Sequence, residues 1–392
     1  MKAALNPYNP GSGLRPPALA GRDSELEALD VTLERTSAGL SNRGIILTGL
    51  RGVGKTVLLN EMRDRAETAD WFVVGVEARA DAAGTASVQR ALARDMAAQA
   101  RRLSRARHVT DRIKQALQSV SAFSLSLGAK GIDLGVTIEP GRADSGDIEV
   151  DLPELVQDLC LALAEQGSAF GLFIDEMQDL DADLLRALLV TQHQAGQRGW
   201  SFYIMGAGLP HLPGVLSETR SYAERLFDYR TISRLHENDA ISALVQPALP
   251  HGVSYTDDAL QVLLEASGGY PYFLQEYGRG TWEVAGSPQF TAADARDGVA
   301  LGLQRLDAGF FASRWKRATP AERRLLIAMA DDQDNPSTSS EVARRMGIKP
   351  TSLGPYRANL ISKGLVYAPE HGMLAYTVPG MSAFVFRHRD DF

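Results

Sequence analysis

A glycine-rich segment that ends in lysine and threonine carries the clearest chemistry in the sequence. Residues 45–56 are IILTGLRGVGKT, and the spacing G-x-x-x-x-G-K-T is that of a phosphate-binding loop (P-loop) between a strand and a helix. Such glycines let backbone N–H groups point at phosphate oxygens, and the positive end of the next helix faces the same anion. Lys55 is expected to reach the β- and γ-phosphates, and the Thr56 hydroxyl to ligate Mg²⁺. The segment predicts a nucleotide site formed by Gly49, Gly52, Val53, Gly54, Lys55, Thr56 and Val57.

A second apolar segment ends in two acidic residues. Residues 169–176 are AFGLFIDE, which predicts a buried strand followed by Asp175 and Glu176. Asp175 is expected to hold Mg²⁺ through water, and Glu176 to act as the general base that polarises the attacking water. The alternative is a strand that merely ends in a solvated acidic turn. If the two segments meet, the sequence predicts nucleotide hydrolysis as well as binding.

The elements around these residues alternate between strand and helix. Apolar strands are expected near residues 45–48, 71–76, 169–174 and 200–205, and helical stretches follow the first, second and third of them. This order predicts an α/β domain with a doubly wound parallel sheet over residues 21–230.

Composition narrows the class of protein. The 392 residues suffice for two or three domains, and the sequence has neither a run of about 18 apolar residues nor an apolar signal core. A single cysteine, Cys160, favours a core position and a reducing, cytoplasmic location. The formal net charge is −7, but residues 313–392 have 12 Lys and Arg against 8 Asp and Glu, and residues 90–114 have eight basic residues against two acidic ones. Such local patches are where contact with DNA is expected.

Two stretches of the first domain have less regular patterns. Residues 1–20 are rich in proline and glycine and predict an extended arm. The alternating residues 123–127 and 135–139 predict a β-hairpin inserted at about 121–150. This hairpin is expected either to touch DNA or a neighbouring subunit, or to be a passive elaboration.

The C-terminal part predicts two further domains. Residues 231–306 have helical patterns only, which predicts a helical lid. Residues 313–392 have three helical patterns followed by a hairpin, the order of a winged helix-turn-helix. Its third helix, 349–363, is expected to offer Lys349, Thr351, Ser352, Arg357 and Asn359 to a DNA groove. Winged helices also bind proteins, so both kinds of partner stay open.

Several motifs together resemble the AAA+/STAND-type P-loop ATPases, and within them the origin-recognition-like branch of archaeal and bacterial ATPases. They are GLRGVGKT, FIDE, LAGRDSEL at 19–26, YAERLF at 222–227, GGYPYF at 268–273 and the predicted winged helix. The resemblance implies binding of ATP or ADP with Mg²⁺, and hydrolysis by Glu176 with Lys55. It also implies that Gly21 and Arg22, completed by Glu25, lie near the adenine, and that Pro271 lies against the nucleotide.

The resemblance also suggests an arginine finger, a residue that acts on ATP bound by a neighbouring subunit of a homo-oligomer. Arg225 is the first candidate and Arg220 the substitute, and the alternative is an ordinary salt-bridged arginine. Two features depart from the family pattern. The strand 200–205 is followed by Gly-Ala-Gly where many members have a polar sensor, and the lid turn lacks a sensor arginine, for which Arg279 lies too far along. Both departures favour a slow switch over a fast motor.

Two functional hypotheses follow. In the first, an ATP-dependent switch couples its nucleotide state to duplex DNA through the winged helix. In the second, a STAND-like signalling or defence regulator uses the winged helix to bind protein.

Overall fold

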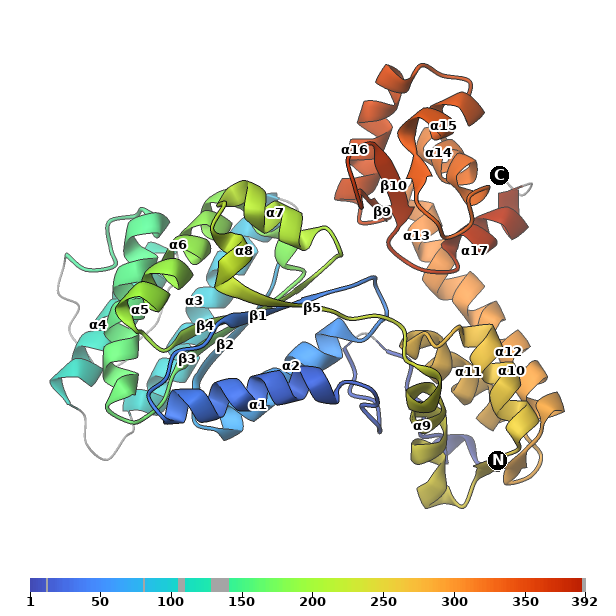
Figure 1. Ribbon diagram of the computed structural model, residues 1–392, viewed down its shortest axis with the longest axis horizontal. Coiled ribbons are helices and arrows are strands. Elements are labelled where there is room, and N and C mark those ends of the chain that lie inside the picture. Colours follow the sequence, from blue (N-terminus) through green and yellow to red (C-terminus); the bar gives the residue numbers. More distant parts are fainter. Residues whose placement is uncertain (12, 80–81, 105–109, 128–140, 390–392) are drawn as a thin grey trace.

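A parallel β-sheet forms the centre of the first half of the chain. The computed structural model describes residues 1–11, 13–79, 82–104, 110–127 and 141–389 (Figure 1). Its five-stranded sheet has the order β2-β3-β4-β1-β5, and all neighbouring pairs are parallel. The predicted doubly wound α/β architecture is thereby confirmed. The strands are β1 (Gly44–Thr48), β2 (Phe72–Glu77), β3 (Phe170–Asp175), β4 (Phe202–Gly208) and β5 (Phe227–Thr231).

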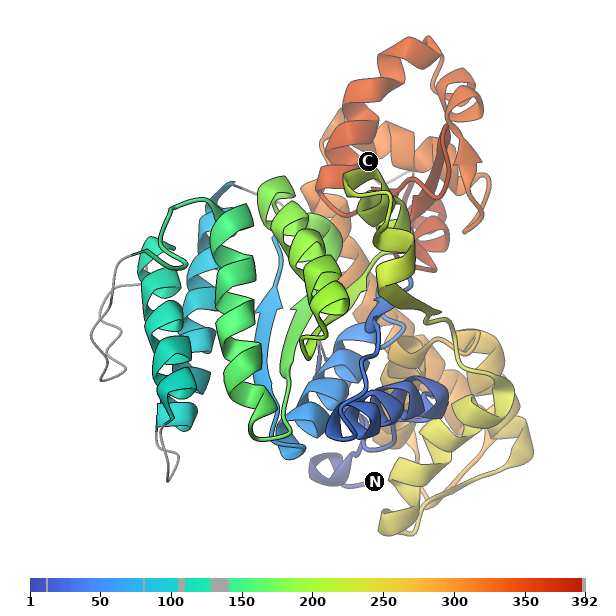
Figure 2. The ribbon, with the colours of Figure 1, turned by 60° about the vertical axis from the view of Figure 1, so that its left-hand side comes forward.

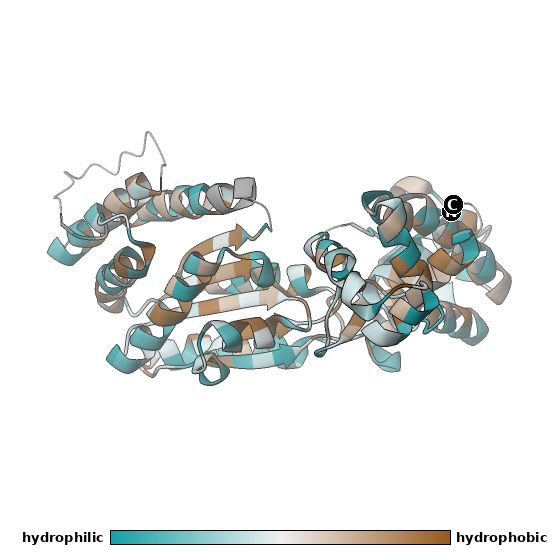
Figure 3. Cartoon of the chain, turned by 90° about the horizontal axis from the view of Figure 1, so that it is seen from above, coloured by the Kyte–Doolittle hydropathy of each residue, from teal (hydrophilic) through white to brown (hydrophobic). Residues whose placement is uncertain are grey.

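Helices cover both faces of this sheet (Figures 1 and 2). Leu47 on one face of β1 belongs to the same core as Leu58 of α2, whereas Ile46 on the other face belongs to the core that contains α3, α5 and α6. A strand buried on both sides needs apolar residues at successive positions, and Figure 3 shows the apolar colour concentrated on the strands between the helical layers. The helices are α1 (Asp23–Ser37), α2 (Lys55–Thr68), α3 (Ala82–Ser104), α4 (Asp111–Ser126), α5 (Ile148–Ala164), α6 (Ala182–Arg198), α7 (Leu212–Thr219) and α8 (Ala223–Leu226), with a short 3₁₀ turn at Met177–Asp179.

The predicted hairpin at about 121–150 is wrong in its first strand. Phe123 lies in α4, and its side chain is buried with those of Ile113, Leu117 and Val120, which follow a helical repeat. The intervening serines imitated a strand pattern, but Ser121 donates a hydrogen bond to the Leu117 carbonyl one turn back and so fits within the helix. The expected second strand, 135–139, lies outside the described residues.

A smaller helical region follows β5 and packs under the N-terminal arm. It has four helices, but the expectation of helices alone is wrong, because two short strands pair in parallel between them. The arm has one 3₁₀ turn, Ala3–Leu5, and is otherwise irregular. The elements are α9 (Glu237–Ala248), a 3₁₀ turn (Leu249–His251), β6 (Ser254–Tyr255), α10 (Asp257–Ser267), α11 (Pro271–Val284), β7 (Gln289–Phe290) and α12 (Ala292–Arg305).

The C-terminal region is joined to α12 by a π-helical turn, Leu306–Phe311. The expected third helix at 349–363 is shorter, because the proline-containing segment Pro350–Leu353 forms a 3₁₀ turn and α16 begins only at Gly354. Within the described ranges, no helix is both long and apolar enough to cross a membrane. The elements are α13 (Ala312–Arg317), α14 (Pro320–Ala330), β8 (Ser337–Thr338), α15 (Ser339–Arg345), α16 (Gly354–Ser362), β9 (Val366–Tyr367), β10 (Met373–Tyr376) and α17 (Met381–His388), with the sheet order β8-β10-β9.

Candidate nucleotide-binding site

The P-loop has the backbone that its glycines predict. Gly52 and Gly54 have φ values of 89° and 95°, a region that favours glycine. A Cβ atom at Gly49 would lie 2.2 Å from the Ile232 carbonyl oxygen, so that position has no room for a side chain. The loop leads directly into the N-terminus of α2, whose free N–H groups favour an anion.

Lys55 is folded back onto the loop. Its Nζ donates hydrogen bonds to the carbonyl oxygens of Gly49 and Leu50, both at 2.9 Å. Burial lowers the pKa of Lys55 to about 8, although the nearby charges of Glu176 and Asp175 act in the opposite direction. The phosphate oxygens of a nucleotide would compete for this cation with two neutral carbonyls.

Thr56 and Asp175, the two predicted Mg²⁺ ligands, lie in contact although they are 119 residues apart. The Thr56 hydroxyl donates to Asp175 Oδ2 at 2.7 Å. Burial is the main cause that raises the pKa of Asp175, the charge of Glu176 adds to it, and the Thr56 hydrogen bond opposes it. A hydroxyl and a carboxylate side by side are the oxygen donors that Mg²⁺ prefers, so the residues present fit this ion.

Glu176 is held in an unusual backbone conformation. Its φ and ψ are 50° and 41°, the left-handed region that few residues other than glycine adopt. Its Oε1 is paired with Arg51 Nη1 at 2.6 Å, and its Oε2 accepts a hydrogen bond from Gln178 Nε2 at 2.8 Å. Such local strain persists where the surroundings hold the residue in place, and it clusters at functional sites.

Gln178 is a site residue that sequence reasoning missed. Its Oε1 accepts the Leu209 N–H at 3.0 Å just beyond β4, while its amide holds Glu176. A Cβ atom at Gly208 would lie 2.5 Å from this oxygen, so the glycine leaves room for Gln178. The polar group that the end of β4 lacks is thus supplied from the neighbouring loop, and the only sequence signal was a glutamine two residues after Glu176.

Arg22 braces the site from the side. Its Nη2 donates to the carbonyl oxygens of Val53 at 3.0 Å and Ser233 at 2.7 Å, and burial lowers its pKa. Gly21 has a φ of 64°, and a Cβ atom there would collide with Asp239 of α9. This pair therefore fixes the P-loop relative to the start of the helical region.

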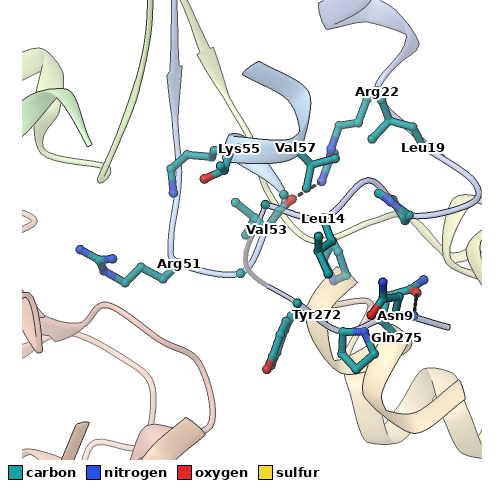
Figure 4. A pocket seen from close by; sticks show the side chains of 18 of the residues that line it. Asn9, Leu14, Leu19, Arg22, Arg51, Val53, Lys55, Val57, Tyr272 and Gln275 are labelled. Atoms are coloured by element: carbon teal, nitrogen blue, oxygen red, sulfur yellow. Dashed lines mark hydrogen bonds between the residues drawn. The ribbon is translucent and has the colours of Figure 1, made fainter. Parts of the chain in front are cut away.

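These elements surround a cavity of about 340 Å³ (Figure 4), a size that suits a small-molecule ligand. Two of the residues predicted to bind nucleotide, Gly21 and Gly49, do not line it. The predicted site residues that do line it are Arg22, Gly52, Val53, Gly54, Lys55, Thr56, Val57, Asp175, Glu176 and Pro271. Further lining residues were not predicted and come from the arm, α11 and the connection to the C-terminal region: Asn9, Pro10, Gly11, Gly13, Leu14, Tyr272, Gln275, Phe310 and Arg314.

Arg314 is the most unusual of these additional residues. Its guanidinium lies 3.8 Å from the centre of the Phe310 ring, and it donates to the Phe310 carbonyl at 2.8 Å. Burial lowers its pKa to about 10, and the charges of Arg51 and Arg317 add to this effect. No carboxylate in the described part of the chain forms an ion pair with it. No sequence pattern links Arg314 to a loop more than 250 residues earlier.

The candidate arginine fingers lie elsewhere. Arg225 is exposed on α8 and does not line the cavity, and Arg220 forms an ion pair with Glu149 at 3.6 Å. One chain therefore does not bring either of them to its own P-loop.

The C-terminal region contacts the P-loop directly. The Arg51 N–H donates to the Thr377 carbonyl at 2.9 Å, and the Arg51 guanidinium lies against Gly364. The rings of His211 and Tyr367 also stack across this contact, with centroids 6.1 Å apart. Arg51 thus touches both Glu176 and the C-terminal region.

Comparison with known proteins gives different families for the two parts of the chain. Residues 18–201 match the AAA ATPase domain, and residues 308–385 match a domain of unknown function, DUF8462. No curated protein matches the chain.

Several solved structures of low identity are similar to this chain. The Walker-type ATPase PABY2304 of Pyrococcus abyssi is 15% identical with a TM-score of 0.59, over 97% of this chain and 99% of its own. The Aeropyrum pernix Orc1 protein in complex with DNA is 15% identical with a TM-score of 0.46, over 96% and 94%. The Thermotoga maritima RuvB Holliday junction branch migration motor is 15% identical with a TM-score of 0.45, over 93% and 96%. At this identity the likeness to the Pyrococcus abyssi ATPase bears on the fold alone.

Proposed function

Residues 18–201 belong to the AAA ATPase domain family, and on that premise we propose that the chain is an ATP-hydrolysing switch whose nucleotide state controls DNA binding by its C-terminal region. The family makes the chain a nucleotide-binding ATPase of the AAA+ class. The proposal adds Mg²⁺ as the metal, duplex DNA as the partner and a winged helix-turn-helix as the means of contact. It retains the division into an arm (1–20), an ATPase domain (21–230), a lid (231–306) and a winged helix (313–392).

The contact network of Arg51 carries this proposal. Its guanidinium holds Glu176, and its backbone N–H holds the Thr377 carbonyl of the C-terminal region. The same cavity is lined by the P-loop and by Arg314, which begins that region. A phosphate group that draws Arg51 or Arg314 toward itself would therefore change two things. It would alter the ion pair that holds the general base Glu176, and it would alter the contact between the C-terminal region and the P-loop.

Each protein group has a defined part in hydrolysis. Lys55 binds terminal phosphate oxygens, and Thr56 with Asp175 would hold Mg²⁺, which neutralises developing charge on those oxygens. Glu176 accepts the proton of the attacking water, with Gln178 fixing one carboxylate oxygen. Arg51 must first leave the other oxygen, because an ion-paired carboxylate is a weaker proton acceptor.

The C-terminal surface is the favoured contact with DNA. Lys349, Thr351, Ser352 and Asn359 are exposed around the start of α16 and along it. In the basic stretch 90–114, by contrast, Arg102 is paired with Glu67, Lys114 with Asp111, and Arg112 with Glu165. Paired cations attract phosphate less, and several C-terminal cations are paired as well, such as Lys363 with Glu322, but Lys349 forms no ion pair among the described residues. The surface around Lys349 is therefore the stronger candidate.

The alternative remains a STAND-like regulator in which this region binds protein. The contact between the C-terminal region and Arg51 of the P-loop favours this alternative. A protein partner that displaced the contact would also release Arg51 from its position beside Glu176. Assembly of a homo-oligomer on ATP, with the exposed Arg225 acting on a neighbour's nucleotide, fits either version. We keep a cytoplasmic location as part of the proposal, and Cys160 is buried in the core.

The deciding experiment measures ATP turnover by the full chain with and without duplex DNA, beside the Glu176→Gln variant. Stimulation by DNA that disappears in the variant supports the switch, whereas turnover indifferent to DNA supports the regulator.

Direct DNA binding adds a matched pair of lysine variants. Lys349→Ala should weaken binding and reduce the slope of affinity against salt by about one, because one phosphate contact is lost. Lys114→Ala removes an exposed lysine from the basic stretch and should change neither. The opposite pattern would assign the DNA contact to residues 90–114.

A further inference from the structure

We propose that the N-terminal arm completes the base-binding half of the nucleotide site, with Leu14 covering one face of the purine and the side-chain amides of Asn9 and Gln275 facing its polar edge. This inference rests on the proposed function, because it takes the ligand to be a purine nucleoside triphosphate.

The first part of the arm is fastened to the helical region. The terminal amine of Met1 donates to the Ala285 carbonyl at 3.0 Å, and Trp282 Nε1 donates to the Lys2 carbonyl at 3.0 Å. Tyr8 is only 3% exposed, and its hydroxyl donates a hydrogen bond to the Leu244 carbonyl of α9. The path of residues 1–8 is therefore fixed.

The other end of the arm is fastened to the P-loop helix. Arg15 Nη1 pairs with Glu61 Oε2 of α2 at 3.0 Å. A Cβ atom at Gly13 would lie 3.2 Å from the Thr56 methyl group, so the arm passes close beside the motif threonine. The described residues between the two anchors cross the cavity and line it.

The arm is shaped around Leu14. A Cβ atom at Gly11 would lie 2.4 Å from Leu14 Cδ1, so the absence of a side chain there lets the backbone fold against the leucine. Leu14 stays 49% exposed and lines the cavity, and Figure 4 shows its side chain pointing toward the middle. Other apolar residues line the cavity with it: Leu19, Val57, Leu235 and Pro271. An apolar slot of this kind fits the flat face of a base.

The amides lie at the opposite side of the cavity from the phosphate-binding cations. Figure 4 shows Lys55 and Arg51 on the left, and Asn9 and Gln275 on the lower right. Gln275 is largely buried, and its Oε1 accepts the Asn9 N–H at 3.3 Å, which leaves its NH₂ group and the Asn9 amide as polar groups on this side. Amide side chains offer a donor and an acceptor together, the pattern that adenine presents at N6 and N7.

The test compares ATP with inorganic tripolyphosphate, which has the phosphates without the base. Binding of each is measured by calorimetry to the full wild-type chain, to Leu14→Ala and to Leu5→Ala. Leu5 is the matched control because it is an equally exposed leucine of the same arm, at 49%, that does not line the cavity.

Leu14→Ala should weaken ATP binding roughly tenfold, as expected for losing most of one buried leucine contact, and leave tripolyphosphate binding unchanged. Leu5→Ala should change neither. Unchanged ATP affinity in Leu14→Ala, or equal losses for both ligands, would overturn the inference while the phosphate site stands. A wild-type chain that binds neither ligand would instead overturn the proposed function.

A second measurement concerns the amides. Asn9→Ala should narrow the ratio of ATP affinity to GTP affinity, since the amide loses its match to adenine. An unchanged ratio would remove Asn9 from base recognition.

Discussion

At the scale of single residues, the cavity gathers a buried lysine, Asp175 and the strained Glu176. Lys55 donates hydrogen bonds to two neutral carbonyls, whereas Glu176 is held by Arg51 and Gln178. The charges that hydrolysis needs are therefore present, but the base is engaged by a cation of the P-loop itself.

Replacing the base should separate binding from hydrolysis. We expect Glu176→Gln to retain ATP binding, because Lys55, Thr56 and Asp175 are untouched, and to lower turnover about 10²- to 10⁴-fold. Steady-state phosphate release and equilibrium binding of ATP measure the two effects, and Lys55→Ala, which should abolish binding, is the comparison. Turnover equal to that of the wild type would remove Glu176 from the mechanism.

The lowered pKa of Lys55 predicts a pH dependence of ATP affinity. Below pH 8 the lysine is charged, and above it the free protein must take up a proton to bind phosphate, so affinity should fall roughly tenfold by pH 9. The arginine of the Lys55→Arg variant stays charged, so the ATP affinity of this variant should not change between pH 8 and pH 9. A flat profile in the wild type would contradict the assignment.

The same shift affects folding stability with a defined sign. Because burial lowers the folded-state pKa of Lys55, the folded chain binds fewer protons than the unfolded chain between pH 8 and about 10.4. The contribution of Lys55 to the free energy of unfolding should therefore rise with pH across this window.

At the scale of elements, α13 is the helix that joins the cavity to the C-terminal region. Its Arg314 is partly buried and stacked on Phe310. Burial lowers the pKa of Arg314, and the positive charge of Arg51 adds to this effect. A guanidinium in this position favours an anion, and the terminal phosphate is the anion that the site is proposed to receive.

Arg314→Gln should therefore weaken ATP binding more than ADP binding, by roughly tenfold for ATP, as expected for one charge-assisted hydrogen bond. Fluorescence titration with both nucleotides measures the difference. Lys316→Gln is the control, since Lys316 is an exposed cation on the same helix outside the cavity. Equal losses for ATP and ADP would show that Arg314 does not distinguish the terminal phosphate.

At the scale of the whole molecule, the C-terminal region is held to the ATPase domain at the P-loop. The hydrogen bond from Arg51 to Thr377 and the stacking of His211 on Tyr367 join segments far apart in the sequence. A nucleotide that moves Arg51 would act directly on the first of these two contacts.

Hydrogen exchange measured by mass spectrometry tests this coupling in the full chain. ATP added to Glu176→Gln, which should retain it, is expected to raise exchange in peptides that cover residues 364–377. Peptides from α4, on the far side of the sheet, should not change. Exchange that is the same with ATP, with ADP and without nucleotide would mean that the two parts are not coupled.

The sequence determined the parts of the site that local patterns encode. The spacing of glycines before Lys55, and an apolar strand ending in Asp175 and Glu176, require only short-range chemistry, and the confirmed parallel sheet brings Thr56 and Asp175 into contact. The hairpin prediction failed because serines of a buried helix alternate with apolar residues as in a strand, and only packing against α3 and α5 distinguishes the two.

Tertiary structure alone decided which distant residues join the site. Leu14, Gln275 and Arg314 line the cavity because the arm, α11 and α13 converge on the P-loop, and Arg51 meets Thr377 more than 300 residues away. No periodicity or spacing encodes such contacts, because they depend on how separate elements pack. The sequence thus determined the phosphate-binding chemistry, and the packing of the arm, the helical region and the C-terminal region decided what surrounds it.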